Sequence, residues 1–373
     1  MLVHAAVIPL SRSIVTSVIS LVLAATAVQP VTQPVAAATA PTAAQLVGQK
    51  LMVAMSGTTP SSDLLARIKA GQVGGVILFG SNISSAAQLR SLTSKLRSAA
   101  AQGGQPPLLI STDQEGGAIK RLPWAAPTVT PSQMGSSGSA STALAQGTAT
   151  GIDLGCAGIN NDLAPVADVP ASTSSFMYQQ GRTWSFSAST TATVSDAFAS
   201  GLEAGHDVPA MKHFPGLGYA TANTDTHVVT ITASKSALAP GLLPYQKAIG
   251  HDIPLIMLSN ATYTAYDAAN AAGWSHAISV DLLRNTLGFT GVSMTDSLSG
   301  TAASRGVSAT SLAIKAAKAG TDMILLTGSE ASSKSTYATL LTDAQNGTIP
   351  VATLRASYDR IRALKSRLTA PAP

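Results

Sequence analysis

The sequence predicts a (β/α)8 barrel, an α/β fold in which eight parallel strands alternate with helices. Two observations carry this prediction. Eight short runs recur along the chain, each apolar almost throughout rather than at every second position, which is typical of strands buried on both faces. The segments between several of these runs have apolar residues at helical spacing. Alternating strands and helices over 373 residues favour a barrel in a single catalytic domain.

The predicted strands follow one another at intervals that leave room for a helix between most pairs. They are residues 51–55, 75–79, 108–112, 159–166, 208–213, 254–259, 291–296 and 322–327. Helical spacing is clearest at 84–102, 189–205 and 309–320, and a helix is also expected at 354–368 with its basic residues facing outward. An open doubly wound sheet is the alternative, but no Gly-x-Gly-x-x-Gly motif follows the first strand.

Residues 1–40 predict a signal peptide and leader rather than part of the fold. This segment has one charged side chain, Arg12, then an apolar run at 14–28 and Ala-x-Ala sequences at 25–27 and 38–40. The apolar run is short and interrupted for a membrane span, although an uncleaved anchor remains the alternative. We therefore expect residues 41–373 to be the catalytic domain, secreted or associated with the cell envelope, without stable membrane insertion after processing.

Composition excludes several classes of protein. Only 11% of residues are charged, so the chain is not a charge-rich disordered protein. The formal net charge is +5, but the basic residues are scattered and form no nucleic-acid-binding run. Cys156 is the single cysteine, which excludes a disulfide within the chain and a cysteine-based metal site. We expect a monomer that needs no metal and no other cofactor.

Charged residues gather at the ends of the predicted strands. Asp113 follows the third strand, Asp168 the fourth, Lys212 and His213 end the fifth, and Asp296 ends the seventh. A single aspartate in such a place is most simply a helix cap. Since the carboxyl ends of the strands build the active site in this fold, a set of charged groups arriving from four strands indicates a functional site.

A second pair of candidate residues lies in a loop rich in Gly, Thr and Asn. Asp225 and His227 are two residues apart, so the carboxylate could hydrogen-bond the imidazole and favour its protonated form. Such a pair suits general acid and base chemistry near neutral pH. Together with the carboxylate of Asp296, it resembles the nucleophile and acid/base of a retaining glycosidase, with a histidine in place of the usual second carboxylate. A merely solvated loop is the alternative.

Several motifs together resemble glycoside hydrolase family 3, and within it the single-domain bacterial β-N-acetylhexosaminidases. They occur in the family's order from about Leu51 to Leu326. The motifs are GGVILFGSN (74–82), STDQEGGAIKRL (111–122), INNDLAPVADV (159–169), AMKHFPGLG (210–218), NTDTH (223–227), IMLSNATY (256–263), LRNTLGFTGVSMTDSL (283–298) and AAKAGTDMILL (316–326).

The resemblance implies a role for each matching residue. Asp296 would be the nucleophile and His227 the acid/base, with Asp225 orienting the imidazole. The residues that would hold the terminal sugar are Asp113, Arg121, Arg182, Lys212 and His213. Arg and Lys donors and Asp acceptors suit sugar hydroxyls. Trp124, Trp184 and Trp274 are expected to be packing residues; of the three, Trp184 is the best candidate for stacking on a sugar because it neighbours Arg182.

The resemblance also implies an activity. It is the hydrolysis of terminal β-N-acetylglucosamine from cell-wall or chitin-type fragments through a covalent intermediate. The partner would be carbohydrate rather than nucleic acid. Three alternatives stay open: a β-glucosidase or other exo-glycosidase, a glycoside phosphorylase, and a weakly catalytic sugar-binding barrel.

Overall fold

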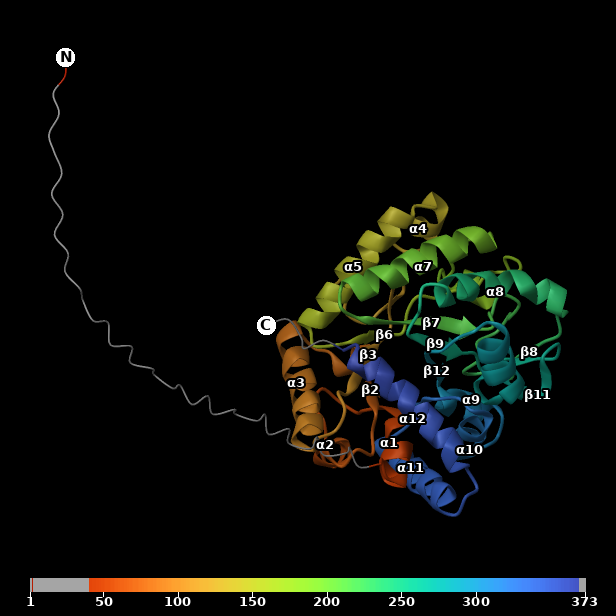
Figure 1. Cartoon of the computed structure of the whole chain (residues 1–373). Helices are drawn as coiled ribbons and strands as arrows, with labels where there is room; N and C mark the ends of the chain where they lie inside the picture. The colour runs from red at the N-terminus through yellow and green to blue at the C-terminus, as the bar shows by residue number, and fades with distance from the viewer. Residues whose placement is uncertain (1, 3–39, 369–373) are drawn as a thin grey trace. The chain divides into compact units, whose positions relative to one another are not determined.

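The computed structural model describes residue 2 and residues 40–368, and its central feature is a parallel sheet of eight strands (Figure 1). Every pairing between neighbours in this sheet is parallel. In spatial order the strands are β12 (Val292–Thr295), β9 (Leu255–Leu258), β7 (Val208–Phe214), β6 (Asn161–Asp162), β3 (Leu109–Thr112), β2 (Gly75–Ile77), β1 (Leu51–Ala54) and β13 (Ile324–Leu326).

A parallel bridge between Met294 and Met323 joins the two ends of this order, so the sheet closes into a barrel. The predicted (β/α)8 fold is confirmed, and each of the eight predicted runs overlaps one of these strands. Strand β6 differs most from its predicted length, since it occupies only two residues of the predicted run 159–166. Pro165 lies in this run and has no amide hydrogen to donate to a ladder.

Helices surround the barrel in Figure 1. Nine of them begin after a serine or threonine whose hydroxyl accepts a hydrogen bond from the backbone three residues later, which explains where these helices start. The helices are α1 (Ala43–Gln49), α2 (Ser62–Lys69), α3 (Ala86–Gln102), α4 (Pro131–Ser137), α5 (Ala140–Cys156), α6 (Phe176–Gln179), α7 (Ala188–Ala204), α8 (Lys235–Ile249), α9 (Leu298–Ser304), α10 (Ala309–Ala319), α11 (Glu330–Gln345) and α12 (Val351–Ser366).

Smaller elements lie mostly in the connections. A short antiparallel hairpin follows β3, and a three-stranded sheet joins the segments after β7 and β9. These elements are η1 (Gly80–Asn82), β4 (Gln114–Gly116), β5 (Ile119–Lys120), β8 (Thr230–Ile231), β10 (Thr262–Tyr263), β11 (Asp267–Ala271), η2 (Ala272–Trp274) and the π-helix η3 (Ala277–Thr286). Residues 1–40, the predicted leader, lie outside the described residues apart from Leu2 and Ala40.

The strands are buried on both faces, as their continuous apolar sequences predict. Met52 of β1 faces the barrel interior with Met257 and Met294, whereas its neighbours Leu51 and Val53 pack outward against the helices. Within residues 40–368, no helix has the length and apolar character that crossing a bilayer requires.

Helix α12 closes the end of the barrel at which the strands begin, and it crosses in front of the strands in Figure 1. Its Ile361 and Leu364 join the interior core. Lys365 is buried, and its Nζ donates to Gln49 Oε1 at 2.7 Å and to the Gly74 carbonyl at 2.6 Å.

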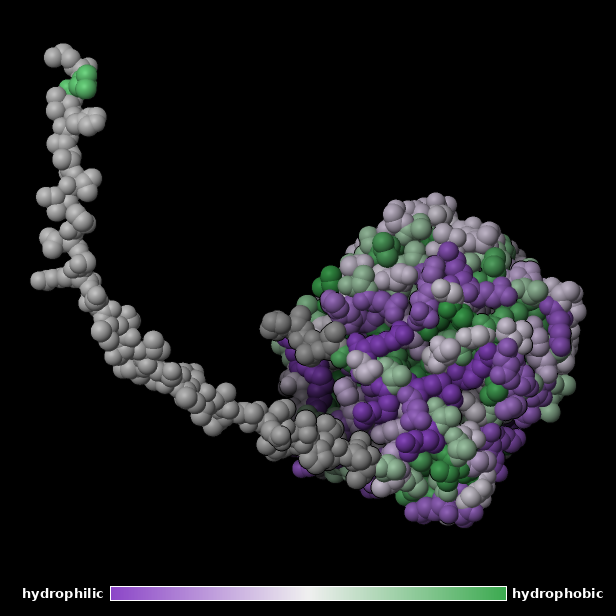
Figure 2. Space-filling model, viewed as in Figure 1, coloured by the Kyte–Doolittle hydropathy of each residue, from purple (hydrophilic) through white to green (hydrophobic). Residues whose placement is uncertain are grey.

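The surface over α12 is largely hydrophilic (Figure 2). The prediction of outward basic residues on this helix is confirmed for Arg355, Arg362 and Arg367, which are exposed. It is wrong for Lys365 and Arg360. The helix lies across the strand beginnings, where Lys365 reaches the Gly74 carbonyl, and Arg360 points inward to the buried carboxylate of Asp322.

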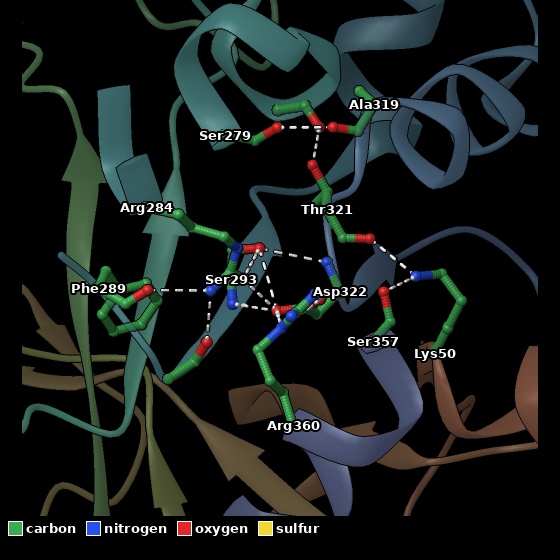
Figure 3. Close-up of polar contacts among 12 residues, drawn as sticks. Lys50, Ser279, Arg284, Phe289, Ser293, Ala319, Thr321, Asp322, Ser357 and Arg360 are labelled. Carbon is green, nitrogen blue, oxygen red and sulfur yellow. Dashed lines mark hydrogen bonds and ion pairs between the residues drawn. The ribbon is translucent and has the colours of Figure 1, made fainter. Parts of the chain in front are cut away.

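Asp322, just before β13, anchors α12 through a group of buried charges that we call the closing cluster: Asp322, Arg284 and Arg360 (Figure 3). Arg360 Nη2 donates to Asp322 Oδ1 at 2.7 Å, and Arg284 binds Oδ2. The Ser293 amide donates to the same Oδ2 at 3.0 Å. Lys50 Nζ lies nearby and donates to Ser357 Oγ of α12 at 2.9 Å. These bonds tie the last helix to β12 and β13.

Candidate active site

A cavity of about 270 Å³ opens at the opposite end of the barrel, where the strands end. Its floor is apolar, with Ile77, Leu163, Met257 and Leu325 contributed by four different strands or their continuations. Its walls are mostly polar. The polar residues that line it are Asp113, Glu115, Arg121, Gln180, Arg182, Lys212, His213, Asn223, Thr224, Asp225, Asp296, Ser297 and Thr327.

A larger groove of about 640 Å³ lies near the strand beginnings, between the ends of α3, α5 and α7. The described residues that line it are mostly apolar and include no carboxylate. The residues that line this groove therefore offer no carboxylate nucleophile for glycoside cleavage. The smaller cavity collects seven of the eight residues to which the family resemblance gives a role, and His227 is the exception.

Four buried or half-buried charges form a lattice on one wall, which we call the cavity cluster: Asp113, Glu115, Arg182 and Lys212. Lys212 Nζ lies 2.9 Å from Asp113 Oδ1 and 2.7 Å from Glu115 Oε1. Arg182 binds Glu115 through two parallel hydrogen bonds of 2.8 and 2.7 Å. Arg121 Nη2 approaches Asp113 Oδ2 at 3.4 Å. These ion pairs fix the positively charged side chains of Arg182 and Lys212 at the edge of the cavity.

These contacts keep the groups ionised. Burial alone would raise the pKa of Glu115, but Arg182 and Lys212 overcome this and hold that pKa well below its ordinary value. Burial alone would likewise lower the pKa of Lys212, and Asp113 and Glu115 raise it instead. Charged donors therefore face the cavity over the whole physiological pH range, as recognition of hydroxyl and amide oxygens requires.

Asp168 holds the segment that follows Lys212. Its Oδ2 lies 2.8 Å from His213 Nδ1, and its Oδ1 accepts from the Leu217 amide at 2.7 Å. Asp168 is fully buried, while His213 lines the cavity. A carboxylate bound to Nδ1 fixes the orientation of the imidazole ring. The direction of the other ring nitrogen, Nε2, is therefore set by Asp168.

Asp296 directly follows β12 and enters the cavity from the wall. Its amide donates to the Leu258 carbonyl at 2.9 Å, which continues the parallel ladder with β9. Its Oδ1 accepts from the Ser297 amide at 2.7 Å. Asn260 Nδ2 donates to the Ser297 carbonyl at 2.8 Å and fixes the turn. The carboxylate is thus held on a strand end with one oxygen already oriented.

Asp225 and His227 lie differently from the arrangement that their spacing suggested. Asp225 lines the cavity, and its Oδ1 is buried with no hydrogen-bond partner among the described residues. Burial, followed by the nearby Asp296, raises the pKa of Asp225 to about 7. His227 is exposed, and its Nδ1 lies 2.9 Å from Thr226 Oγ1. Within residues 40–368 no hydrogen bond joins the two side chains.

Sequence reasoning did not assign the supporting residues. Glu115 stood within the Asp-x-Glu-Gly-Gly motif without a role, and Asp168 was only one of several strand-end carboxylates. Their function as partners of Arg182 and His213 depends on contacts 67 and 45 residues apart in sequence. Trp184, the favoured tryptophan for stacking, is buried, and its ring packs on Phe198. It therefore belongs to the core.

The family model described as the glycosyl hydrolase family 3 N terminal domain matches residues 42–364. The chain belongs to glycosyl hydrolase family 3. It is accordingly a glycoside hydrolase, and the cavity lies at the end of the barrel where active sites are found in this fold. The resemblance noted from the motifs is confirmed at the level of the family.

Two known proteins are similar to this chain over most of its length. The chain is 32% identical over 330 residues to an uncharacterized secreted glycosyl hydrolase of Arthroderma benhamiae, covering 87% of this chain and 93% of that one. It is 33% identical over 286 residues to a β-hexosaminidase of Nitrosomonas eutropha, covering 74% and 80% respectively.

Solved structures show the same fold. A family 3 β-N-acetylglucosaminidase from a Paenibacillus species superposes with a TM-score of 0.84 at 29% identity, over 90% of this chain and 64% of that one. The β-N-acetylhexosaminidase of Beutenbergia cavernae gives a TM-score of 0.81 at 32% identity, over 88% of this chain and 99% of that one.

Proposed function

We propose that this chain is an exported, retaining β-N-acetylhexosaminidase that removes terminal β-N-acetylglucosamine from cell-wall or chitin-type fragments. The observation that carries the proposal is Asp296, a carboxylate on a strand end inside a cavity walled by fixed cations and carboxylates. The relatives named as β-hexosaminidases support the choice of sugar.

In the proposed reaction, an Asp296 oxygen attacks the anomeric carbon while the glycosidic bond breaks. His227 gives a proton to the departing oxygen. Water then attacks the glycosyl ester, His227 takes a proton from it, and Asp296 is released as carboxylate, so the anomeric configuration is retained. Asp113, Arg121, Arg182, Lys212 and His213 would hold the terminal sugar in position for both steps.

His227 must move for this role, because it is exposed and lies outside the residues that line the cavity. The turn that carries it is closed by amides of Thr226 and His227 that both donate to the Asn223 carbonyl, at 3.2 and 2.9 Å. Rotation of this turn would bring His227 over the cavity and place Asp225 beside its ring. The unpartnered oxygen of Asp225 would then gain the imidazole N–H as its donor.

The decisive experiment compares aryl β-N-acetylglucosaminide and aryl β-glucoside side by side, each with and without phosphate. We expect faster release of the aryl group from the first substrate and no dependence on phosphate. Preference for the glucoside, or formation of a sugar phosphate, would overturn the assignment in favour of the two corresponding alternatives. Absence of turnover on both would favour a sugar-binding barrel.

Export is tested separately. Signal peptides are cleaved after small residues, which places the start of the mature chain between about residues 28 and 41. N-terminal sequencing of material secreted by a bacterial host should therefore find the first residue in this range. An intact Met1 in the soluble fraction would contradict export.

A further inference from the structure

Aromatic side chains are distributed unevenly over the surface of the barrel. Within residues 40–368, four are largely exposed: Trp124, Tyr178, Phe186 and Tyr219. All four lie in connections that leave the cavity ends of β3, β6 and β7, which are neighbours in the sheet. Exposed apolar groups gathered beside a binding cavity, rather than scattered singly, indicate a contact surface.

Three of these rings lie on two segments that are bonded to each other. Tyr178 and Phe186 touch, with ring centroids 4.8 Å apart and planes inclined at 48°. Tyr219 stands between Gly218 and Ala220, whose carbonyls accept from the amides of Ala171 and Phe176. We call Tyr178, Phe186 and Tyr219 the aromatic platform.

The platform is continuous with the cavity. Tyr178 belongs to the four-residue helix α6, which also places Phe176 and Met177 in the cavity wall, and Gln180 follows directly. The Tyr219 hydroxyl donates to the Ala237 carbonyl at 3.3 Å, so this ring is restrained as well. A sugar chain that enters the cavity by its terminal residue would therefore leave it beside rings that are already held in place.

The segments that carry the platform are largely free of charge. Residues 169–181, 183–195 and 214–222 contain no Asp, Glu, Lys or Arg, and they are rich in serine, threonine and glutamine. Aromatic rings pack on the apolar C–H faces of sugar rings, and amides and hydroxyls exchange hydrogen bonds with sugar hydroxyl and acetamido groups. A charged peptide or an acidic polymer would find no ionic partner on these segments.

We propose that the aromatic platform binds the sugar units that follow the terminal residue of the substrate, and that it selects a neutral, linear β-linked oligosaccharide of N-acetylglucosamine over fragments that carry charged peptides. This inference rests on the proposed function for the identity of the terminal sugar. It adds a second binding surface, outside the cavity, that is used only by substrates longer than one sugar unit plus an aryl group.

The test is a comparison across chain length. In the wild-type enzyme, kcat/KM for N-acetylglucosamine oligomers should rise from the dimer to the tetramer. Tyr178→Ala and Tyr219→Ala should each lower kcat/KM for the tetramer about threefold to tenfold, chiefly through KM, as expected for the loss of one ring contact. Both should leave the aryl monosaccharide unaffected. Tyr178→Phe keeps the ring and should keep the wild-type value.

Ile152→Ala is the matched control, since Ile152 is equally exposed but lies at the other end of the barrel. It should change neither substrate. An equal loss on the tetramer and the aryl monosaccharide, or no loss on the tetramer, would overturn the proposal. A larger loss on a muramyl-peptide fragment than on the tetramer would overturn the selectivity for neutral chains.

Titration with a sulfur-linked tetramer of N-acetylglucosamine, which is not hydrolysed, separates this proposal from the proposed activity. If no aryl glycoside is cleaved but the thio-tetramer binds, and Tyr178→Ala weakens its binding about threefold to tenfold, the platform stands while the assigned activity fails. If the aryl glycoside is cleaved and thio-tetramer affinity is the same in wild type and Tyr178→Ala, the activity stands and the platform fails.

Discussion

Both ends of the barrel carry a cluster of buried charges, but the two clusters leave different groups available. In the closing cluster, the carboxylate of Asp322 is fully buried and both oxygens are occupied by guanidinium, amide and hydroxyl donors. In the cavity cluster, Asp113 keeps 14% of its side chain exposed, and Lys212 and Arg182 line open space. A carboxylate whose oxygens are all occupied by donors can only hold two parts of the chain together. Charged side chains that face open space still have hydrogen-bonding positions free for a ligand.

The largest effect expected at the cavity end is that of Asp296→Asn. A carboxamide is a poor nucleophile, so kcat should fall about 10⁴-fold or more, while thermal stability and ligand binding persist. A fluorinated sugar should label wild-type enzyme on a peptide containing residues 291–300. Asp281→Asn, at an exposed carboxylate of η3, is the control and should retain full activity. Labelling of any other peptide would refute Asp296 as nucleophile.

The next effect concerns His227→Ala and depends on the leaving group. Natural disaccharides need protonation of the departing oxygen, so their turnover should fall by about two to four orders of magnitude. An activated aryl glycoside should lose much less, and azide should restore part of its turnover. His276→Ala, at another exposed histidine, should behave as wild type. Equal losses on both substrates without azide rescue would make His227 a binding residue.

At the closed end, Asp322→Ala should act on stability instead. It leaves two buried or half-buried guanidinium groups without their carboxylate, which costs about 3–5 kcal/mol of unfolding free energy. Urea denaturation gives the value. The folded fraction should keep the kcat of the wild type. Asp359→Ala removes the exposed partner of Arg355 on α12 and should cost less than about 0.5 kcal/mol. Similar losses for both variants would contradict the distinction.

The smallest effect is a pH dependence at Lys365. Burial lowers the pKa of Lys365 to about 7, whereas the unfolded chain has an ordinary lysine. The unfolded state therefore binds more protons between pH 7 and about 10.5, so this group makes stability rise with pH across that window.

Lys365→Met should reduce the slope of unfolding free energy against pH by up to about 1.4 kcal/mol per pH unit within this range. Exposed Lys318→Met should leave the slope unchanged. The same slope in Lys365→Met as in wild type would show that the lysine remains charged when the protein is folded.

The sequence predicted the barrel because strands buried on both faces leave a signal in each run separately. It predicted strand-end residues for the same reason: Asp296 and Lys212 need only their own strand to be placed. Contacts between distant segments leave no such signal. The lattice around Glu115 and the burial of Lys365 each require two parts of the chain to meet, and helical spacing alone gave the wrong environment for Lys365.

Side-chain contacts within loops also could not be predicted from the sequence. The Asp225–His227 spacing allows a hydrogen bond, but spacing does not set the backbone dihedrals of an irregular turn. There the Thr226 hydroxyl lies next to the histidine and is its observed partner. Trp184 packs in the core, as expected for the tryptophans, and the alternative of stacking on a sugar is wrong for a related reason. Its proximity to Arg182 in sequence says nothing about which way each side chain points, and the neighbouring Tyr178 and Phe186 are the rings that face solvent.

The position of α12 has a consequence for how the protein is made. Lys365 reaches Gln49 and Gly74, and β1 pairs with β13, so segments near the two ends of residues 40–368 depend on each other. During synthesis, the strand beginnings stay uncovered until α12 has left the ribosome, and Ile361 and Leu364 cannot fill the barrel interior before then. The nascent chain is thus kept from completing its fold by the order in which its residues emerge, and contacts of such long sequence separation also form slowly.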